Sequence, residues 1–177
     1  MRSGPQLRII TPSATLAIEP PRQALRLKLK PKAPSTGYVD GAWWPRSLDL
    51  STELPALLAV LAVRLGRVRR VSYNLTAWNP APRRLHVEDQ LVRLGGFHFQ
   101  DPRTMDVFGL EGPRITLLVL PPGTDQTIAH RVLMAAARRD NIDNLDELFS
   151  PIATTGIRPD SAMERWEVDG GRVYAHG

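Results

Sequence analysis

Two adjacent tryptophans near the start of the chain constrain the fold more than any other feature. Trp43 and Trp44 are two of the four tryptophans in the sequence, and Gly41 and Pro45 flank them closely. Two indole rings of this size must either be buried or form a surface that a partner covers. Because glycine allows a positive φ and proline fixes φ, the segment predicts a rigid corner between an N-terminal strand and the first helix.

The segments on either side of this corner show clear hydrophobic periods. Residues 25–30 alternate leucine with lysine or arginine, which predicts a half-buried strand with a charged outer face. Leucines recur at helical spacing from Leu54 to Leu65, and Gly66 follows as a stop, so this segment predicts the first helix. Since alanine and valine fill much of the remaining circumference, we expect this helix to be covered on more than one side.

The second half of the chain is typical of a strand-rich segment followed by another helix. Strands are predicted after the first helix at residues 67–76, 84–88, 91–97 and 105–110. Gly95 and Gly96 predict a bulge or, alternatively, a close approach of another backbone or a ligand. The apolar run at residues 115–120 predicts a central strand that is buried on both faces. Thr124 and Asp125 then supply the N-cap of the second helix.

The order of these elements predicts an α+β fold. Short connections between strands imply antiparallel neighbours, so we expect a two-layer sandwich with a mainly antiparallel sheet of five to six strands and two helices on one face. Residues 22–140 form a single α+β domain in this interpretation. An N-terminal arm at residues 1–21 precedes it, and an acidic extension at residues 141–177 with a short hairpin follows.

Cysteine is absent from the sequence. Its absence excludes disulfides, thiolate nucleophiles and cysteine-ligated metals, and fits a cytoplasmic protein. No apolar run follows the first arginine as in a signal peptide, and the apolar stretch at residues 54–63 is too short to cross a bilayer. We therefore expect no contact with a membrane.

The chain is basic, with a net charge of +5 and an isoelectric point near 10.2. Residues 1–40 contain seven basic and two acidic residues, whereas residues 141–177 contain three basic and seven acidic ones. Opposite charges at the two ends predict neutralisation within one subunit or between two. Since an acidic tail would compete with nucleic acid, a nucleic-acid partner is the weaker alternative. The basic surface in that alternative would be formed by Arg26, Lys28, Lys30, Lys32, Arg67, Arg69 and Arg70.

No motif specifies a catalytic or metal site. The residues that could supply two imidazoles and one carboxylate to a metal are His98, His130 and either Asp101 or Asp106. Their spacing is not that of a metal-binding motif. Ser47, Ser51 and Ser72 lie outside a nucleophile elbow, and the glycines form no phosphate or dinucleotide loop. We expect no catalytic residue, no metal and no cofactor.

The residues that we expect to bind a ligand are Asp40, Trp43, Trp44 and Arg46. The two rings would form the floor of a pocket for a small molecule or peptide, and Arg46 would hold the ligand. Nearby apolar rings would raise the pKa of Asp40, whereas the arginine would lower it. Alternatively, these charged residues bind no ligand and only stabilise the fold. Asp40 would then form an ion pair with Arg46, or its carboxylate would accept backbone N–H bonds in the turn.

Several segments together resemble a known family, namely residues 37–47, 72–74, 78, 93–97, 116–119 and 121–122. They are similar, over about residues 25–139, to a family of short actinobacterial proteins classed as a domain of unknown function. The segment at residues 37–47, with the sequence GYVDGAWWPRS, is the specific part. The resemblance implies a lineage and no activity, cofactor or catalytic residue.

We expect an uncharacterised binding or regulatory module that acts through a tryptophan-rich surface, as a homodimer in the cytoplasm. Its ligand would be a protein or a small molecule. The apolar first helix, the tryptophan corner and the lack of a catalytic set motivate this hypothesis. The alternatives are a small cysteine-free enzyme with a pocket near Asp40, Trp43, Trp44 and Arg46, and a basic nucleic-acid-associated protein.

Overall fold

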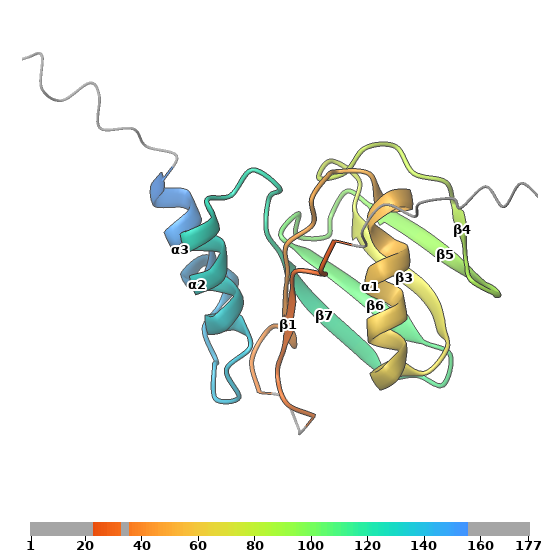
Figure 1. The fold of residues 1–177 in the computed structure, drawn as a ribbon, viewed down its shortest axis with the longest axis horizontal. Helices are drawn as coiled ribbons and strands as arrows, with labels where there is room; N and C mark the ends of the chain where they lie inside the picture. The colour runs from red at the N-terminus through yellow and green to blue at the C-terminus, as the bar shows by residue number, and fades with distance from the viewer. Residues whose placement is uncertain (1–22, 33–35, 156–177) are drawn as a thin grey trace, which may run out of the picture.

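The computed structural model of the chain describes residues 23–32 and 36–155. This part consists of one seven-stranded sheet and three helices (Figure 1). The strands are β1 (Leu27–Leu29), β2 (Gly41–Trp43), β3 (Val68–Asn74), β4 (Arg84–Val87), β5 (Gln90–Phe97), β6 (Thr104–Gly109) and β7 (Arg114–Val119). The helices are α1 (Leu50–Leu65), α2 (Gln126–Ala136) and α3 (Leu145–Thr155). The arm predicted at residues 1–21 and the hairpin predicted near the C-terminus lie outside the described residues.

The sheet is mixed, with the strand order β1-β2-β7-β6-β3-β5-β4. Two neighbouring pairs are parallel, β2 with β7 and β3 with β5, and the other four pairs are antiparallel. It follows that β2, β7, β3 and β5 all run in one direction. Their carboxyl ends therefore lie along the same edge of the sheet, which positions the candidate site described below.

Helices cover both faces of this sheet. The leucines of α1 pack on one face, in a core that includes Trp43 and Leu117. α2 and α3 pack on the other face, in a core that includes Ala42, Trp44 and Leu118. Consecutive strand residues belong to different cores because side chains alternate between the two faces of a strand. Figure 1 shows α1 in front of β3 and β6, and α2 together with α3 on the side of β1.

The predicted α+β class is confirmed, but the predicted arrangement differs from the structure in three respects. The sheet has seven strands rather than five to six, it is mixed because two of its six strand pairs are parallel, and the helices do not share one face. The main reason is that the predicted corner contains a strand of its own, β2, which pairs in parallel with the distant β7. In addition, the β4–β5 hairpin folds back so that β5 rather than β4 lies beside β3.

Gly41 has a role different from the predicted one. The described glycines with a positive φ are Gly37, Gly66 and Gly112, so Gly41 does not use left-handed backbone. Instead, β1 approaches so closely that a Cβ atom on Gly41 would lie 2.8 Å from the Cα atom of Leu29. Glycine is needed at this position because no side chain fits between the two strands.

The helix boundaries follow the capping chemistry of the sequence. The Asp49 carboxylate accepts a hydrogen bond from the Ser51 amide at 2.9 Å and begins α1 slightly earlier than predicted. Gly66 ends α1 with a φ of 66°, as predicted. Asp125 begins α2, also as predicted, by accepting a hydrogen bond from the Thr127 amide. The predicted central strand is confirmed as β7, which lies between β2 and β6.

α3 is longer than the sequence indicates. The pattern predicts one helical turn at residues 145–149, whereas the helix continues through Pro151 to Thr155. It packs on α2 and buries Leu148 in the α2-side core. Within residues 23–32 and 36–155, no helix is both long enough and apolar enough to span a bilayer.

Candidate functional site

Trp43 is the last residue of β2 and Trp44 directly follows it, and their side chains lie on opposite faces of the sheet because neighbouring residues of extended backbone alternate between faces. Trp43 is fully buried on the α1 side, where its ring stacks on that of Trp78 with 5.6 Å between centroids and 18° between planes. Trp44 is 9% exposed and packs on the α2 side. Both rings are therefore packed inside the protein rather than presented to solvent.

Trp44 connects β2 to the segments on either side of it. Its Nε1 donates a hydrogen bond to the carbonyl oxygen of Pro121 at 3.1 Å. The guanidinium carbon of Arg26 lies 3.5 Å from the centroid of the indole ring, and its Nη2 donates to the Pro45 carbonyl at 2.7 Å. Desolvation, and secondarily the charge of Arg46, lower the pKa of Arg26. These contacts attach the corner to the segment before β1 and to the segment after β7.

Asp40 and Arg46 lie at opposite ends of β2. The Asp40 carboxylate accepts a hydrogen bond from the backbone amide of Thr116 on β7 at 2.8 Å, whereas the alternative considered for this residue placed such bonds within the turn. Arg46 is exposed, and its Nη2 donates to the Ala24 carbonyl at 3.0 Å. The structure thus does not bring the four expected ligand-binding residues together, since the rings are on different faces and the charged groups at different ends.

A crevice lies directly beside the tryptophan corner, at the edge where the carboxyl ends of the strands meet. It has a volume of about 320 Å³. The segments that follow β2, β3 and β7 contribute most of the walls, and α3 contributes one side. The lining includes Pro45, Leu48, Ala77, Trp78, Pro121 and Phe149. We refer to this space as the corner crevice.

The corner crevice lies at a topological switch point. β2 continues into α1 on one face of the sheet, whereas its parallel neighbour β7 continues into α2 on the other face. The two connections diverge and leave a gap outside the carboxyl ends of both strands. In open sheets with parallel strands, ligands bind in the crevice at this position.

Arg103, at the start of β6, forms the charged wall of the corner crevice and is already paired. Its guanidinium donates to the Asp101 carboxylate at 2.9 and 2.7 Å and to Asp146 on α3 at 2.6 Å. The hydrogen bonds from Arg103 lower the pKa of Asp101, and both carboxylates raise the pKa of Arg103. Its guanidinium carbon lies 5.7 Å from the centroid of the Phe149 ring. Arg103 therefore fastens α3 to the sheet edge.

The sequence carries only a weak signal for this crevice. Prolines follow β2 and β7, and the segment after β3 is also rich in proline, which marks the ends of these strands. Nothing local indicates that the three ends meet, because their proximity depends on the order of strands in the sheet. Phe149 and Asp146 are contributed by α3, of which the sequence predicts a single turn.

Several basic residues near the N-terminus are used inside the domain. Lys30 is buried, and its Nζ donates to the carbonyl oxygens of Thr36 and Asn141 at 2.7 and 2.9 Å. Arg26 covers Trp44, as described above. Two of the lysines and arginines assigned to a nucleic-acid surface therefore have structural partners. In the part of the chain that the structure describes, no three histidines or carboxylates are grouped so that they could hold a metal ion.

Comparison of the sequence with known protein families identifies one family that matches it. A model of a family of unknown function, DUF5994, matches residues 26–136, which is more than half of the chain. The chain belongs to the DUF5994 family. The resemblance to a family of unknown function is thereby confirmed. The DUF5994 match begins at β1 and ends with α2, so α3 and its contribution to the corner crevice lie beyond it. No curated protein and no solved structure matches the chain.

Proposed function

We propose that this protein is a binding module whose corner crevice holds a small, mainly apolar molecule. The position of the crevice carries this proposal, since it lies at the switch point between β2 and β7. Its volume of about 320 Å³ lies within the range of known ligand pockets. In this proposal the tryptophan corner lies behind the crevice as a rigid support, whereas the sequence predicted that its two rings form the floor of the pocket. The cysteine-free sequence supports a cytoplasmic setting.

The lining favours an uncharged ligand with an aromatic or branched aliphatic body. The rings of Trp78 and Phe149 and the neighbouring prolines offer apolar contact area. Arg103 is the ionisable side chain among the lining residues, and Asp101 and Asp146 balance its charge. A charged ligand would have to compete with these carboxylates. Because the described lining offers no free acid, base or nucleophile, it supports binding more than catalysis.

Indole, a neutral aromatic probe, tests this proposal. In a titration followed by NMR of the backbone amides, the shifts are expected to centre on Leu48, Ala77, Trp78 and Leu120. Ala77→Phe places a ring in the crevice and is expected to weaken indole binding by about tenfold or more, because it removes the space that the probe occupies. Met134→Phe adds the same ring on α2 outside the crevice, where Met134 is 47% exposed, and is expected to leave binding unchanged.

Two results would contradict this use of the corner crevice. One is a set of indole-induced shifts that centres on another part of the domain. The other is equal binding to the wild-type protein and to Ala77→Phe, with both proteins shown to be folded by their thermal melting curves.

We also propose that the protein is a homodimer through the outer side of α1. The exposed residues Ala56, Ala59, Val60 and Val63 form an apolar stripe at helical spacing on the side away from the sheet. A second copy of the helix would cover this stripe in a self-complementary two-fold contact.

Light scattering across micromolar concentrations is expected to show a dimer for the wild-type protein. Val63→Glu would place a charge in the apolar contact and is expected to give a monomer. Met134→Glu introduces the same charge at an exposed position of α2 and is expected to leave the dimer intact. A wild-type protein that is monomeric at every concentration would exclude the dimer.

A further inference from the structure

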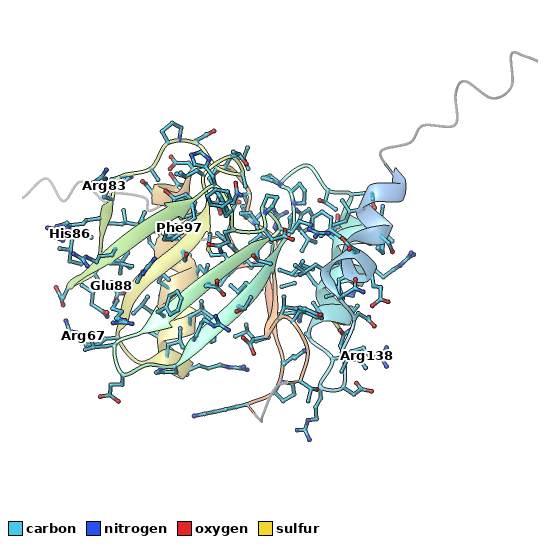
Figure 2. All side chains as sticks on the ribbon, turned by 180° about the vertical axis from the view of Figure 1, so that it is seen from behind. Arg67, Arg83, His86, Glu88, Phe97 and Arg138 are labelled. Atoms are coloured by element: carbon cyan, nitrogen blue, oxygen red, sulfur yellow. The ribbon has the colours of Figure 1, made fainter. Side chains whose placement is uncertain are left out.

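The face of the sheet opposite α1 is only partly covered. α2 packs over β1 and β2 on this face, and α3 packs on α2. Figure 2 looks onto the face, with α1 behind the strands and with α2 and α3 to one side. In the described part of the chain, no helix lies over β6, β3, β5 and β4 on this face.

The register of the strands places four arginines and one phenylalanine in a single row across this open face. In the order of the strands β4, β5, β3, β6 and β7, the row consists of Arg84, Arg93, Arg70, Phe108 and Arg114. Paired residues on neighbouring strands project from the same face, and neighbouring strands lie about 4.8 Å apart. Val71 and Leu94, each next to one of these arginines, belong to the α1-side core, so the row faces away from α1. We refer to it as the arginine row.

Carboxylates do not neutralise the arginine row. The salt bridges found among the described residues involve Arg103 and Arg138, neither of which belongs to the row. Asp106 lies on the same face, two residues before Phe108 on β6. Its carboxylate accepts a hydrogen bond from the hydroxyl of Thr116, the residue opposite it on β7, at 2.6 Å. Like charges directly opposite each other on neighbouring strands destabilise a sheet. Three guanidinium groups on adjacent strands therefore favour an anion that lies over them.

Aromatic rings lie among these arginines. The guanidinium carbon of Arg70 is 5.3 Å from the ring centroid of Phe97 and 5.8 Å from that of Phe108. Phe97, labelled in Figure 2, is 42% exposed at the end of β5. A Cβ atom on Gly95 would lie 3.2 Å from both the Arg70 guanidinium and the Phe97 ring, so glycine allows these side chains to lie close to the sheet. The predicted bulge is wrong, since the register between β3 and β5 is continuous there, and the groups that come close to the glycines are side chains rather than another backbone or a ligand.

A hollow of about 590 Å³ lies beside these side chains. Its lining includes Arg70, Arg83, Arg84, Arg93, Gly95 and Gly96. The hollow thus joins positive charge and accessible backbone in one place, while the exposed Phe97 ring lies next to Gly95 outside its lining.

We propose that this face binds single-stranded nucleic acid, with the arginine row on the phosphates and with Phe97 and Phe108 stacked on bases. Guanidinium groups bind phosphate through paired N–H donors. Aromatic side chains exposed on a sheet stack on unpaired bases. A duplex fits less well, because its bases are already stacked and cannot reach rings on a broad sheet. Free phosphate would account for the arginines and not for the exposed rings.

This surface differs from the basic surface considered in the sequence. Arg26 and Lys30 of that surface are bonded inside the domain, whereas Arg70 alone belongs to both. The arginines of the row come from four strands, and only the register brings them together. The inference does not depend on the corner crevice.

Fluorescence anisotropy with labelled oligothymidine and oligouridine of about 12 nucleotides tests the proposal. We expect binding at low salt that weakens as salt rises, with a slope of log K against log salt of roughly −2 to −3 for three to four phosphate contacts. Arg84→Gln combined with Arg93→Gln is expected to lower the affinity about tenfold or more and to reduce the slope by roughly 1.4. Phe97→Ala is expected to lower the affinity by about tenfold through lost stacking.

A second double variant, Arg131→Gln with Arg138→Gln, removes the same charge from α2 and from the segment just after it, away from the open face. It is expected to change the affinity by less than about twofold, because it leaves the phosphate contacts in place. Thermal melting shows whether each variant is folded. Arg84→Gln with Arg93→Gln is expected to melt at or above the wild-type temperature, since it removes two like charges that oppose each other across a strand pair.

Any of four results would overturn the proposal. The first is no binding of either oligonucleotide at low salt, and the second is a duplex of the same length that binds as tightly as the single strand. The third is an equal loss of affinity in the α2 double variant. The fourth is a combination of two observations: Phe97→Ala binds the oligonucleotide with unchanged affinity, and inorganic polyphosphate displaces the oligonucleotide fully. Together they would show that the face binds phosphate alone.

Discussion

Replacing Trp43 by alanine is expected to lower the free energy of unfolding by about 3–5 kcal/mol, the usual cost of deleting a large buried ring. Trp43 is fully buried, and its ring stacks on Trp78 in the core beneath α1. The deletion would leave a cavity between β2 and α1 and remove the support for Trp78, which lines the corner crevice. Since domains of this size are stable by about 5–15 kcal/mol, the variant would lose a large share of its stability. Urea unfolding followed by circular dichroism measures the loss.

Trp43→Phe and Met134→Ala are the controls for this result. Phenylalanine keeps an aromatic ring in the stack and also removes the Trp43 Nε1, which has no hydrogen-bond partner among the described residues. We therefore expect less than half the loss seen with alanine. Met134→Ala changes an exposed residue of α2 and is expected to alter stability by no more than about 0.5 kcal/mol. A loss in Trp43→Ala no greater than in Met134→Ala would show that Trp43 is not a core residue.

Gly41→Ala is expected to destabilise the fold by about 3 kcal/mol, at the upper end of the cost of overpacking. The added Cβ atom would meet the Lys28 carbonyl oxygen and lie 2.8 Å from the Leu29 Cα atom. Both are backbone atoms, so no side-chain rotation relieves the contact, and β1 must move away from β2. Hydrogen exchange should show faster exchange of the Lys30 amide, which donates to the Asp40 carbonyl at 2.7 Å. The thermal melting temperature should fall in parallel.

Gly123→Ala is the matched control for Gly41→Ala. A Cβ atom on Gly123 would meet no atom within 4 Å, and its φ is not in the left-handed region. We expect stability that is unchanged or raised by about 0.4–1 kcal/mol, because alanine restricts the unfolded chain. Similar melting temperatures for the two variants would contradict the close packing of β1 on β2.

Local patterns predicted most of the helices and strands correctly. The leucine period and Gly66 indicated α1, Asp125 indicated the start of α2, and the segment at residues 91–97 indicated one strand of a hairpin. Each of these signals depends on residues that are close in the sequence. The same kind of signal misjudged residues 41–43, where a glycine and a proline around two tryptophans resemble a turn and instead frame the short strand β2.

The candidate sites were harder to predict than the elements, for two reasons. The four residues expected to bind a ligand are consecutive or nearly so, but β2 directs Trp43 and Trp44 to opposite faces and separates Asp40 from Arg46. Conversely, the side chains of the corner crevice and of the arginine row come from segments far apart in the chain. Neither set shows a local spacing that marks it as a site.

The sequence by itself determined the α+β class, the central position of residues 115–120, the end of α1 at Gly66 and the start of α2 at Asp125, but it left open whether Trp43 and Trp44 are buried or form a surface. It determined these elements because periodicity and capping act over a few residues. Only the tertiary structure decided the strand order, the face that each helix covers, and the pairing of Arg84, Arg93 and Arg70 across three strands. These depend on which distant strands pair and in which register, and the free energy that selects the pairing comes from burying both sides of β2 and β7 at once.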